Sequence, residues 1–126
     1  MTQKILIADD EPSIVAALRF LLQSDGYEVH IARDGEEALR QLDECNPDLV
    51  LLDVMMPVRS GYEICQRIRG RADRRHVKII MLSAKGRDAE VHKGLEFGAD
   101  VYVTKPFSTR ELKATIKRLL GGEASP

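Results

Sequence analysis

Three aspartates follow directly after short apolar runs of the chain. Asp9 and Asp10 come after the run 5–8, and Asp53 comes after the unbroken run 49–52. Two carboxylates about 4 Å apart repel by roughly 1 kcal/mol in water and by about 4 kcal/mol at an intermediate dielectric. A divalent cation removes this repulsion, and a site of hard oxygen ligands favours Mg²⁺, with Mn²⁺ as a substitute. We therefore expect a metal site if the fold brings the two runs together. The ordinary alternative for Asp9 and Asp10 is a solvated loop before a helix.

The position of Asp53 also suits covalent chemistry. A carboxylate can attack a phosphoryl group and form an acyl phosphate. The charge on the phosphoryl oxygens must then be met by cations and hydrogen-bond donors. Ser83 and Lys105 each follow another apolar run, so both are candidates for these contacts. Each also has an ordinary interpretation, Lys105 as a salt-bridge partner of an acid and Ser83 as a turn residue.

The elements that must position these residues alternate along the chain. Strands are expected at residues 4–8, 27–32, 49–52, 77–82 and 101–104. Amphipathic helices are expected from Pro12 to Gly26, from Asp34 to Asn46, at 61–69, at 87–97 and after Ser108. Asp34 and Ser108 each precede a glutamate by three residues, which is the pattern of a capping box. Five strand–helix units predict an α/β protein with a parallel sheet covered by helices on both faces.

The hydrophobic pattern also predicts the strand order. The first, third and fourth strands are nearly continuous apolar runs, as central strands should be, whereas the second alternates apolar and polar residues and the fifth is short. Edges at two and five match a flavodoxin-like, doubly wound (βα)5 fold with the order 2-1-3-4-5. In such sheets ligands bind beyond the carboxyl ends of the strands where the order reverses. Asp9, Asp10 and Asp53 should therefore converge between strands one and three.

Composition limits the class of protein. The 126 residues suit one domain, and a formal net charge of −1 gives no global attraction to nucleic acid or an anionic membrane. No signal peptide or membrane span fits, and the two cysteines form no CxxC motif, so we expect a cytoplasmic protein with reduced thiols. The arginine-rich stretch "RIRGRADRRH" is expected to be a solvated helix end or a partner surface. Residues 1–120 should form the domain, and 121–126 a flexible tail or the start of a linker.

Four segments together resemble the receiver domain of bacterial response regulators: "IADDE", "LVLLDVMMPVRSGYE", "MLSA" and "GADVYVTKPF". The resemblance covers residues 4–120. It implies that Asp53 accepts phosphate from a phosphohistidine of a histidine kinase or a histidine phosphotransfer protein. It also implies that the chain catalyses its own phosphorylation and later hydrolysis but acts mainly as a signalling switch. The downstream target would be a protein that contacts the fourth helix, fifth strand and fifth helix.

The resemblance assigns further roles around Asp53. Asp10 would bind Mg²⁺ directly and Asp9 largely through water, with the backbone carbonyl of Met55 as a further ligand. Lys105 would contact the phosphoryl group, and its peptide bond to Pro106 would be cis. Ser83 and Tyr102 would form a switch pair, in which the hydroxyl moves toward the phosphoryl oxygen and the ring turns inward. The ordinary interpretation of Tyr102 is an edge-strand aromatic that simply packs.

Three other classes of protein fit the sequence less well. A phosphatase of the haloacid dehalogenase type would need a second acid where Met55 stands, and a flavodoxin would need a first loop that accepts phosphate rather than "DDE". A phosphorylation-independent docking module would normally lack an acid or the lysine. We expect a stand-alone regulator, because Val101 and Thr115 replace an acid and an arginine typical of the winged-helix branch. The alternative is the N-terminal receiver of a longer transcription regulator or other multidomain protein; direct nucleic-acid binding is not expected.

Overall fold

A computed structural model describes residues 2–84 and 98–121. Its elements, in chain order, are β1 (Lys4–Ala8), α1 (Pro12–Ser24), β2 (Glu28–Ala32), α2 (Gly35–Cys45), β3 (Leu49–Asp53), α3 (Gly61–Arg69), a 3₁₀ turn (Ala72–Arg74), β4 (Lys78–Ala84), β5 (Val101–Lys105) and α5 (Thr109–Leu119). All strand pairs are parallel and the order is β2-β1-β3-β4-β5, which confirms the predicted fold class and both predicted edges. The helix expected at 87–97 lies outside the described residues.

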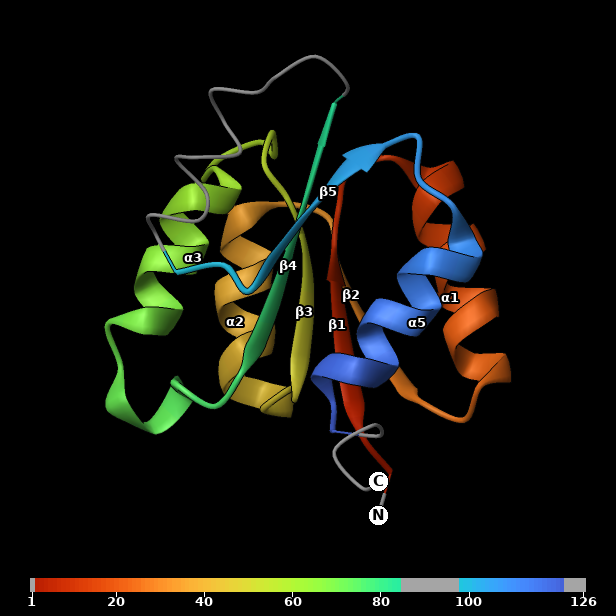
Figure 1. Ribbon diagram of the computed structural model, residues 1–126. Coiled ribbons are helices and arrows are strands. Elements are labelled where there is room, and N and C mark those ends of the chain that lie inside the picture. Colours follow the sequence, from red (N-terminus) through yellow and green to blue (C-terminus); the bar gives the residue numbers. More distant parts are fainter. Residues whose placement is uncertain (1, 85–97, 122–126) are drawn as a thin grey trace.

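The sheet is the middle layer of three. Figure 1 shows α1 and α5 on one face of the sheet and α2 and α3 on the other. Successive side chains of a strand point to opposite faces, so a strand covered on both sides must be apolar throughout. In β3, Leu49 and Leu51 pack with α1 and α5, whereas Val50 and Leu52 pack with α2 and α3. This double burial explains the unbroken apolar run that precedes Asp53.

The helix ends follow from local side-chain chemistry. Asp34 accepts a hydrogen bond from the backbone N–H of Glu37, as its capping pattern predicts, and Ser108 caps α5 in the same way. Ser60 also caps α3 through the N–H of Glu63, which the sequence analysis missed although the Ser-x-x-Glu pattern is present. At the start of α1, by contrast, Pro12 occupies the first turn and Glu11 makes no side-chain cap.

Two kinds of sequence prediction need correction. The fourth and fifth strands continue past their expected ends, so that Ser83 lies within β4 and Lys105 closes β5; neither is a loop residue. The arginine-rich stretch is not uniformly solvated. Arg74 is buried against Asp43, and Arg69 is mostly buried, because its guanidinium contacts several backbone carbonyls. None of the helices in the described ranges is long and apolar enough to cross a bilayer.

Candidate functional site

Register brings the three aspartates together at the carboxyl end of the sheet. Ala8 pairs with Leu52, so the residues that follow them, Asp9 and Asp53, leave the sheet side by side. One carboxylate oxygen from each of Asp9, Asp10 and Asp53 lies within 4.8 Å of the others. Asp9 is fully buried and Asp53 is 5% exposed, whereas Asp10 is exposed. The cluster therefore has a buried floor of two acids and a third acid open to solvent.

Backbone contacts hold the two buried carboxylates in place. Asp9 Oδ1 accepts a hydrogen bond of 2.9 Å from the N–H of Glu11, and Asp53 Oδ1 accepts one of 3.3 Å from the N–H of Met55. Asp9 Oδ2 is buried, and its polar contact among the described residues is the Lys105 ammonium at 3.0 Å rather than a backbone N–H. A buried carboxylate oxygen that depends on one cation is costly to retain, because it has lost its contact with water. A divalent cation could take the place of this ammonium contact.

The loop after β3 fixes Asp53 from the other side. Gly61 opens α3 directly against the end of β3, and a Cβ atom there would collide with the carbonyl oxygen of Asp53. The N–H of Gly61 donates to Val54 O at 2.9 Å. Only glycine allows this close approach of the two backbones. Glycine at this position therefore holds the phosphoacceptor candidate against a rigid helix end.

Lys105 is the cation of the cluster. Its Nζ lies 2.8 Å from Glu11 Oε1, 3.0 Å from Asp9 Oδ2 and 3.6 Å from Asp53 Oδ2. Burial lowers the pKa of the Lys105 ammonium, but contacts with these three acids more than offset it, so that the pKa is raised above 10.5. Lys105 is therefore a charged salt-bridge partner in this state, as its ordinary interpretation predicts. Its peptide bond to Pro106 is cis.

The acid cluster perturbs Asp53 itself. Burial, followed by the negative charge of Asp9, raises the pKa of Asp53 from 3.8 to about 6, although Lys105 and the Met55 N–H act in the opposite direction. A carboxyl group whose pKa is raised by burial and by a neighbouring acid is typical of a functional site rather than of a structural salt bridge. Near neutral pH the group is still mainly ionised, which a nucleophile or a metal ligand requires.

The chemistry of this donor set fits a hard divalent cation. Three carboxylates, two of them buried, supply the charge and the oxygen ligands that Mg²⁺ prefers. Asp9, Asp10 and Asp53 are the residues that could hold it. The Met55 amide contacts Asp53, but the role of the Met55 carbonyl stays a prediction of the resemblance.

Ser83 and Tyr102 lie on the strands beside the cluster. Asp53 pairs with Leu82, so Ser83 is one residue further along β4, and it is buried with 2% exposure. Tyr102 lies on β5, where it pairs with Met81 of β4, and it packs against the core beneath α2 and α3. Its hydroxyl oxygen is buried without a hydrogen-bond partner among the described residues. Ser83 therefore lies on the strand that neighbours Asp53, Tyr102 lies on the edge strand beyond it, and their switch roles stay predictions.

The sequence analysis missed Glu11 as a site residue. The "DDE" motif shows an acid at this position, but the pairing of Glu11 with Lys105 spans 94 positions of the chain. Such a pair depends on how β1 and β5 are placed, and on the conformation of two long side chains. No local pattern therefore indicates it.

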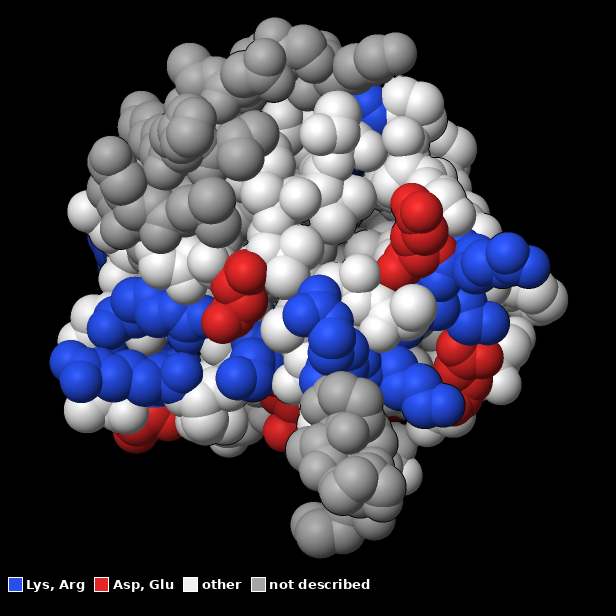
Figure 2. All heavy atoms as spheres, viewed as in Figure 1, with Lys and Arg blue, Asp and Glu red and all other residues white. Residues whose placement is uncertain are grey.

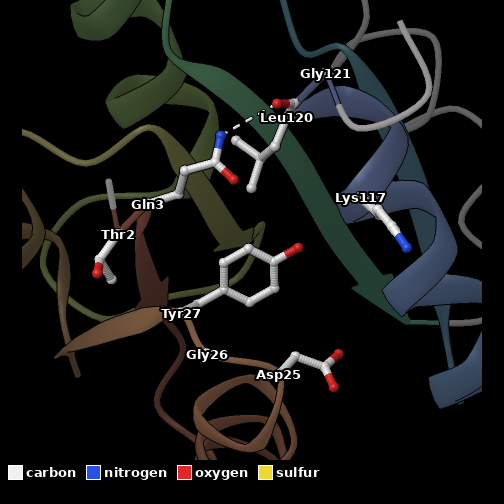
Figure 3. A pocket seen from close by; sticks show the side chains of 8 residues that line it. All are labelled: Thr2, Gln3, Asp25, Gly26, Tyr27, Lys117, Leu120 and Gly121. Atoms are coloured by element: carbon white, nitrogen blue, oxygen red, sulfur yellow. Dashed lines mark hydrogen bonds between the residues drawn. The ribbon is translucent and has the colours of Figure 1, made fainter. Parts of the chain in front are cut away.

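Two hollows formed by the described residues differ in how they lie relative to the acid cluster. One of about 560 Å³ lies at the amino end of the sheet, where the Gln3 side chain donates to Leu120 O and Tyr27 faces Asp25 and Lys117 across the opening (Figure 3). Another of the same volume extends from Asp9 and Asp10 along α1 to the exposed Phe20. The second hollow is the one that adjoins the acid cluster.

Fold and site together define a flavodoxin-like α/β protein with an acid cluster and a lysine at the topological switch point of its sheet. The family model for the response regulator receiver domain matches residues 5–117. The chain belongs to this family.

Individual relatives agree with this assignment. The chain is 47% identical over 120 residues to the alkaline phosphatase synthesis transcriptional regulatory protein PhoP of Bacillus subtilis, covering 95% of this chain and 49% of that protein. It therefore spans about half the length of this curated relative. The receiver domain of a signal transduction histidine kinase from Syntrophus aciditrophicus superposes with a TM-score of 0.89 at 36% identity, covering 99% of this chain and 95% of that one. The chemotaxis response regulator CheY4 of Vibrio cholerae gives 0.87 at 33% identity, covering 94% and 99%.

Proposed function

We propose that this receiver domain accepts a phosphoryl group on Asp53 from the phosphohistidine of a histidine kinase or a histidine phosphotransfer protein. The observation that carries the proposal is a buried carboxylate, Asp53, that lies in a cluster of acids and 3.6 Å from the Lys105 ammonium. Nucleophile and charge-stabilising groups are then already in place before a donor arrives.

The transfer exchanges one bond to phosphorus for another. A carboxylate oxygen of Asp53 attacks phosphorus, the bond from phosphorus to the imidazole nitrogen breaks, and the bonding pair stays on the histidine. Bound Mg²⁺ would neutralise charge on the phosphoryl oxygens. Asp9 and Asp10 hold the cation site, and the Lys105 ammonium is close enough to turn toward a phosphoryl oxygen. Later attack by water on the aspartyl phosphate returns the carboxylate and releases inorganic phosphate.

The output is proposed to be a population shift that alters the surface of β5 and α5, while the helix expected at 87–97, which the resemblance adds to this face, lies outside the described residues. Contacts of the phosphoryl group with Ser83 and Lys105 would favour the active population of this surface. The Tyr102 ring would turn inward when the Ser83 hydroxyl moves toward the phosphoryl oxygen. Asp100, which directly precedes β5, pairs with Arg69 at 2.8 Å. This internal pairing supports a protein contact that does not depend on Asp100.

Two arrangements of the whole protein are compatible with this chemistry. We inferred a stand-alone regulator from the sequence, with residues 1–120 as the receiver and 121–126 as a tail or linker. The PhoP relative supports the alternative, because it is a transcriptional regulatory protein and this chain spans 49% of it. In either arrangement we propose that the receiver itself contacts proteins, and that any DNA binding would reside elsewhere.

Incubation with Mg²⁺ and acetyl phosphate, followed by intact-mass measurement, tests the proposal. Wild type should gain one phosphoryl group, and Asp53→Asn should gain none, because the amide is not a nucleophile of this kind. Asp48→Asn is the matched control, since Asp48 lies at the opposite end of β3, where it accepts a hydrogen bond from Lys4 N. A gain of phosphate by Asp53→Asn would refute the assignment. The assignment would also be refuted if neither protein gained phosphate even from a phosphohistidine donor.

A further inference from the structure

Lys105 lies between two sets of acids, and only one set belongs to the proposed magnesium site. On the inner side are Asp9, which is fully buried, and Asp53, with Oδ2 atoms at 3.0 and 3.6 Å from the ammonium. On the outer side is Glu11, whose side chain is 53% exposed and whose Oε1 lies at 2.8 Å. The shortest of the three contacts is therefore made by the acid nearest to solvent.

The Glu11 side chain does not serve the helix that it precedes. It stands at the N-cap of α1, where a side chain usually accepts a hydrogen bond from the first helical turn, but it caps nothing. Its backbone N–H instead donates to Asp9 Oδ1, and its side chain reaches across to the end of β5. One residue thus contacts Asp9 through its backbone and Lys105 through its carboxylate.

An ammonium and a divalent cation compete for the same oxygens. Asp9 Oδ2 is buried and lies 3.0 Å from Lys105 Nζ, so the ammonium already contacts an oxygen that a divalent cation would use. Without Glu11, the ammonium would have only the inner acids as partners, and it would move toward Asp9 and Asp53. Every step in that direction places a positive charge where Mg²⁺ must bind.

We propose that Glu11 is a positioning residue that holds the Lys105 ammonium at the outer rim of the acid cluster and thereby keeps Asp9 and Asp53 available to a divalent cation. The inference rests on the proposed magnesium site, but not on phosphoryl transfer. Glu11 acts only through Lys105 and touches neither the metal nor a phosphoryl group.

The test is a titration with MgCl₂ alone, followed by ¹H–¹⁵N NMR. The amides of Glu11 and Met55 donate to Asp9 and Asp53, so their shifts report directly on the two carboxylates. Glu11→Gln should weaken Mg²⁺ binding roughly two- to fivefold, which is the range expected for losing one partly exposed ion pair. Salt at about 0.15 M limits the direct effect of the Glu11 charge on the cation.

A double-mutant cycle separates positioning from a simple loss of negative charge. Lys105→Gln alone should tighten Mg²⁺ binding, since the competing ammonium is gone. In that background Glu11→Gln should change the affinity by less than a factor of about 1.5, because no ammonium is left to hold. Glu11→Asp is a second control, since it keeps the charge but is one methylene too short for the contact, and it should behave like Glu11→Gln.

Each outcome decides one question. The positioning role would be overturned if Glu11→Gln weakened Mg²⁺ binding equally in the wild-type and Lys105→Gln backgrounds. It would also be overturned if Glu11→Gln bound Mg²⁺ with wild-type affinity. Absence of any Mg²⁺-dependent shift in wild type would overturn the metal site itself, and the inference with it. Thermal unfolding and the amide spectrum of Glu11→Gln without metal exclude a folding defect as the cause.

Discussion

At the carboxyl end of the sheet the carboxylates of Asp9, Glu11 and Asp53 surround one ammonium, whereas at the amino end acids and bases are matched in pairs. Arg69 pairs with Asp100, and Arg74 pairs with Asp43. Figure 2 shows the lower part of one face, where the strands begin, with Lys and Arg prominent and acids between them. The paired charges at that end connect elements of the fold. The crowded acids at the other end oppose folding, and such a cluster is typical of a functional site.

The matched end can be followed in detail at Arg69. Its guanidinium donates to Gly98 O at 2.8 Å, to Val77 O at 2.7 Å and to Asp100 Oδ2 at 2.8 Å. Asp100 Oδ2 also accepts from the N–H of Ile79 at 2.8 Å. A single side chain thus joins the end of α3 to the residues that begin β4 and β5. Here the charges satisfy one another, and no ligand is required.

The largest expected effect comes from removing the charge of Asp53. Its raised pKa of about 6 means that the folded state binds a proton more tightly than the unfolded state, whose pKa is near 3.8. The cost of the ionised group is absent below about pH 4 and complete well above pH 6, and it corresponds to an upper limit of roughly 3 kcal/mol. Asp53→Asn should therefore be more stable than wild type at pH 7.5 without metal, and the difference should shrink toward pH 4.

Urea unfolding in EDTA at pH 4.5, 6 and 7.5 measures this difference, and a second series in MgCl₂ sharpens it. Magnesium should stabilise wild type more than the variant and so reduce the gap. Asp48→Asn is the control at the matched end, where loss of the acceptor for Lys4 N should destabilise instead. Equal stability of Asp53→Asn and wild type at pH 7.5 would contradict the contrast between the two ends.

A smaller effect of opposite sign is expected at Arg69. Arg69→Ala removes the donors of two backbone carbonyls and of Asp100, and should lower the free energy of unfolding by roughly 2 kcal/mol. Arg69→Lys should recover little of this, because an ammonium cannot reproduce the planar fork. Chemical denaturation checks both variants. Arg67→Ala is the control; its 3.5 Å pair with Glu63 is exposed, and its loss should cost less than about 0.5 kcal/mol. Similar losses for Arg67→Ala and Arg69→Ala would show that the network adds nothing.

The smallest predicted effect concerns Val58, in the loop that follows β3. Its φ of 74° is unusual for a β-branched residue, and the N–H of Arg59 donates to Pro57 O at 2.9 Å to close a γ-turn around it. Val58→Gly should raise the free energy of unfolding by roughly 0.5–1 kcal/mol, since relief of the backbone strain exceeds the added entropy of the unfolded chain. Thermal unfolding would detect this gain. Val58→Ala keeps the Cβ atom and should show none; an equal gain in both variants would point to the exposed side chain rather than to the backbone.

The two ends of the sheet also differ in how far the sequence pattern predicts their side-chain contacts. The acids of the cluster stand at strand ends, and strand ends are visible in the periodicity of a sequence. The Arg69 network was missed, because it joins a helix end to loops far along the chain. The sequence of this arginine-rich stretch predicts a solvated charge run, and it would predict the same whether or not Arg69 and Arg74 were buried. The difference lies in their neighbours across the fold, which a local pattern does not contain.

By itself the sequence determined the five-stranded parallel order, the edges of the sheet and the convergence of Asp9, Asp10 and Asp53 at its carboxyl end. These follow from burial, because a strand covered on both faces must be apolar and a parallel sheet aligns its strand ends. Only the tertiary structure decided that Lys105 contacts Glu11, that a buried oxygen of Asp9 contacts the Lys105 ammonium and that the pKa of Asp53 is raised. Those properties depend on distances of a few ångströms between side chains far apart in the chain, and on how much water reaches them.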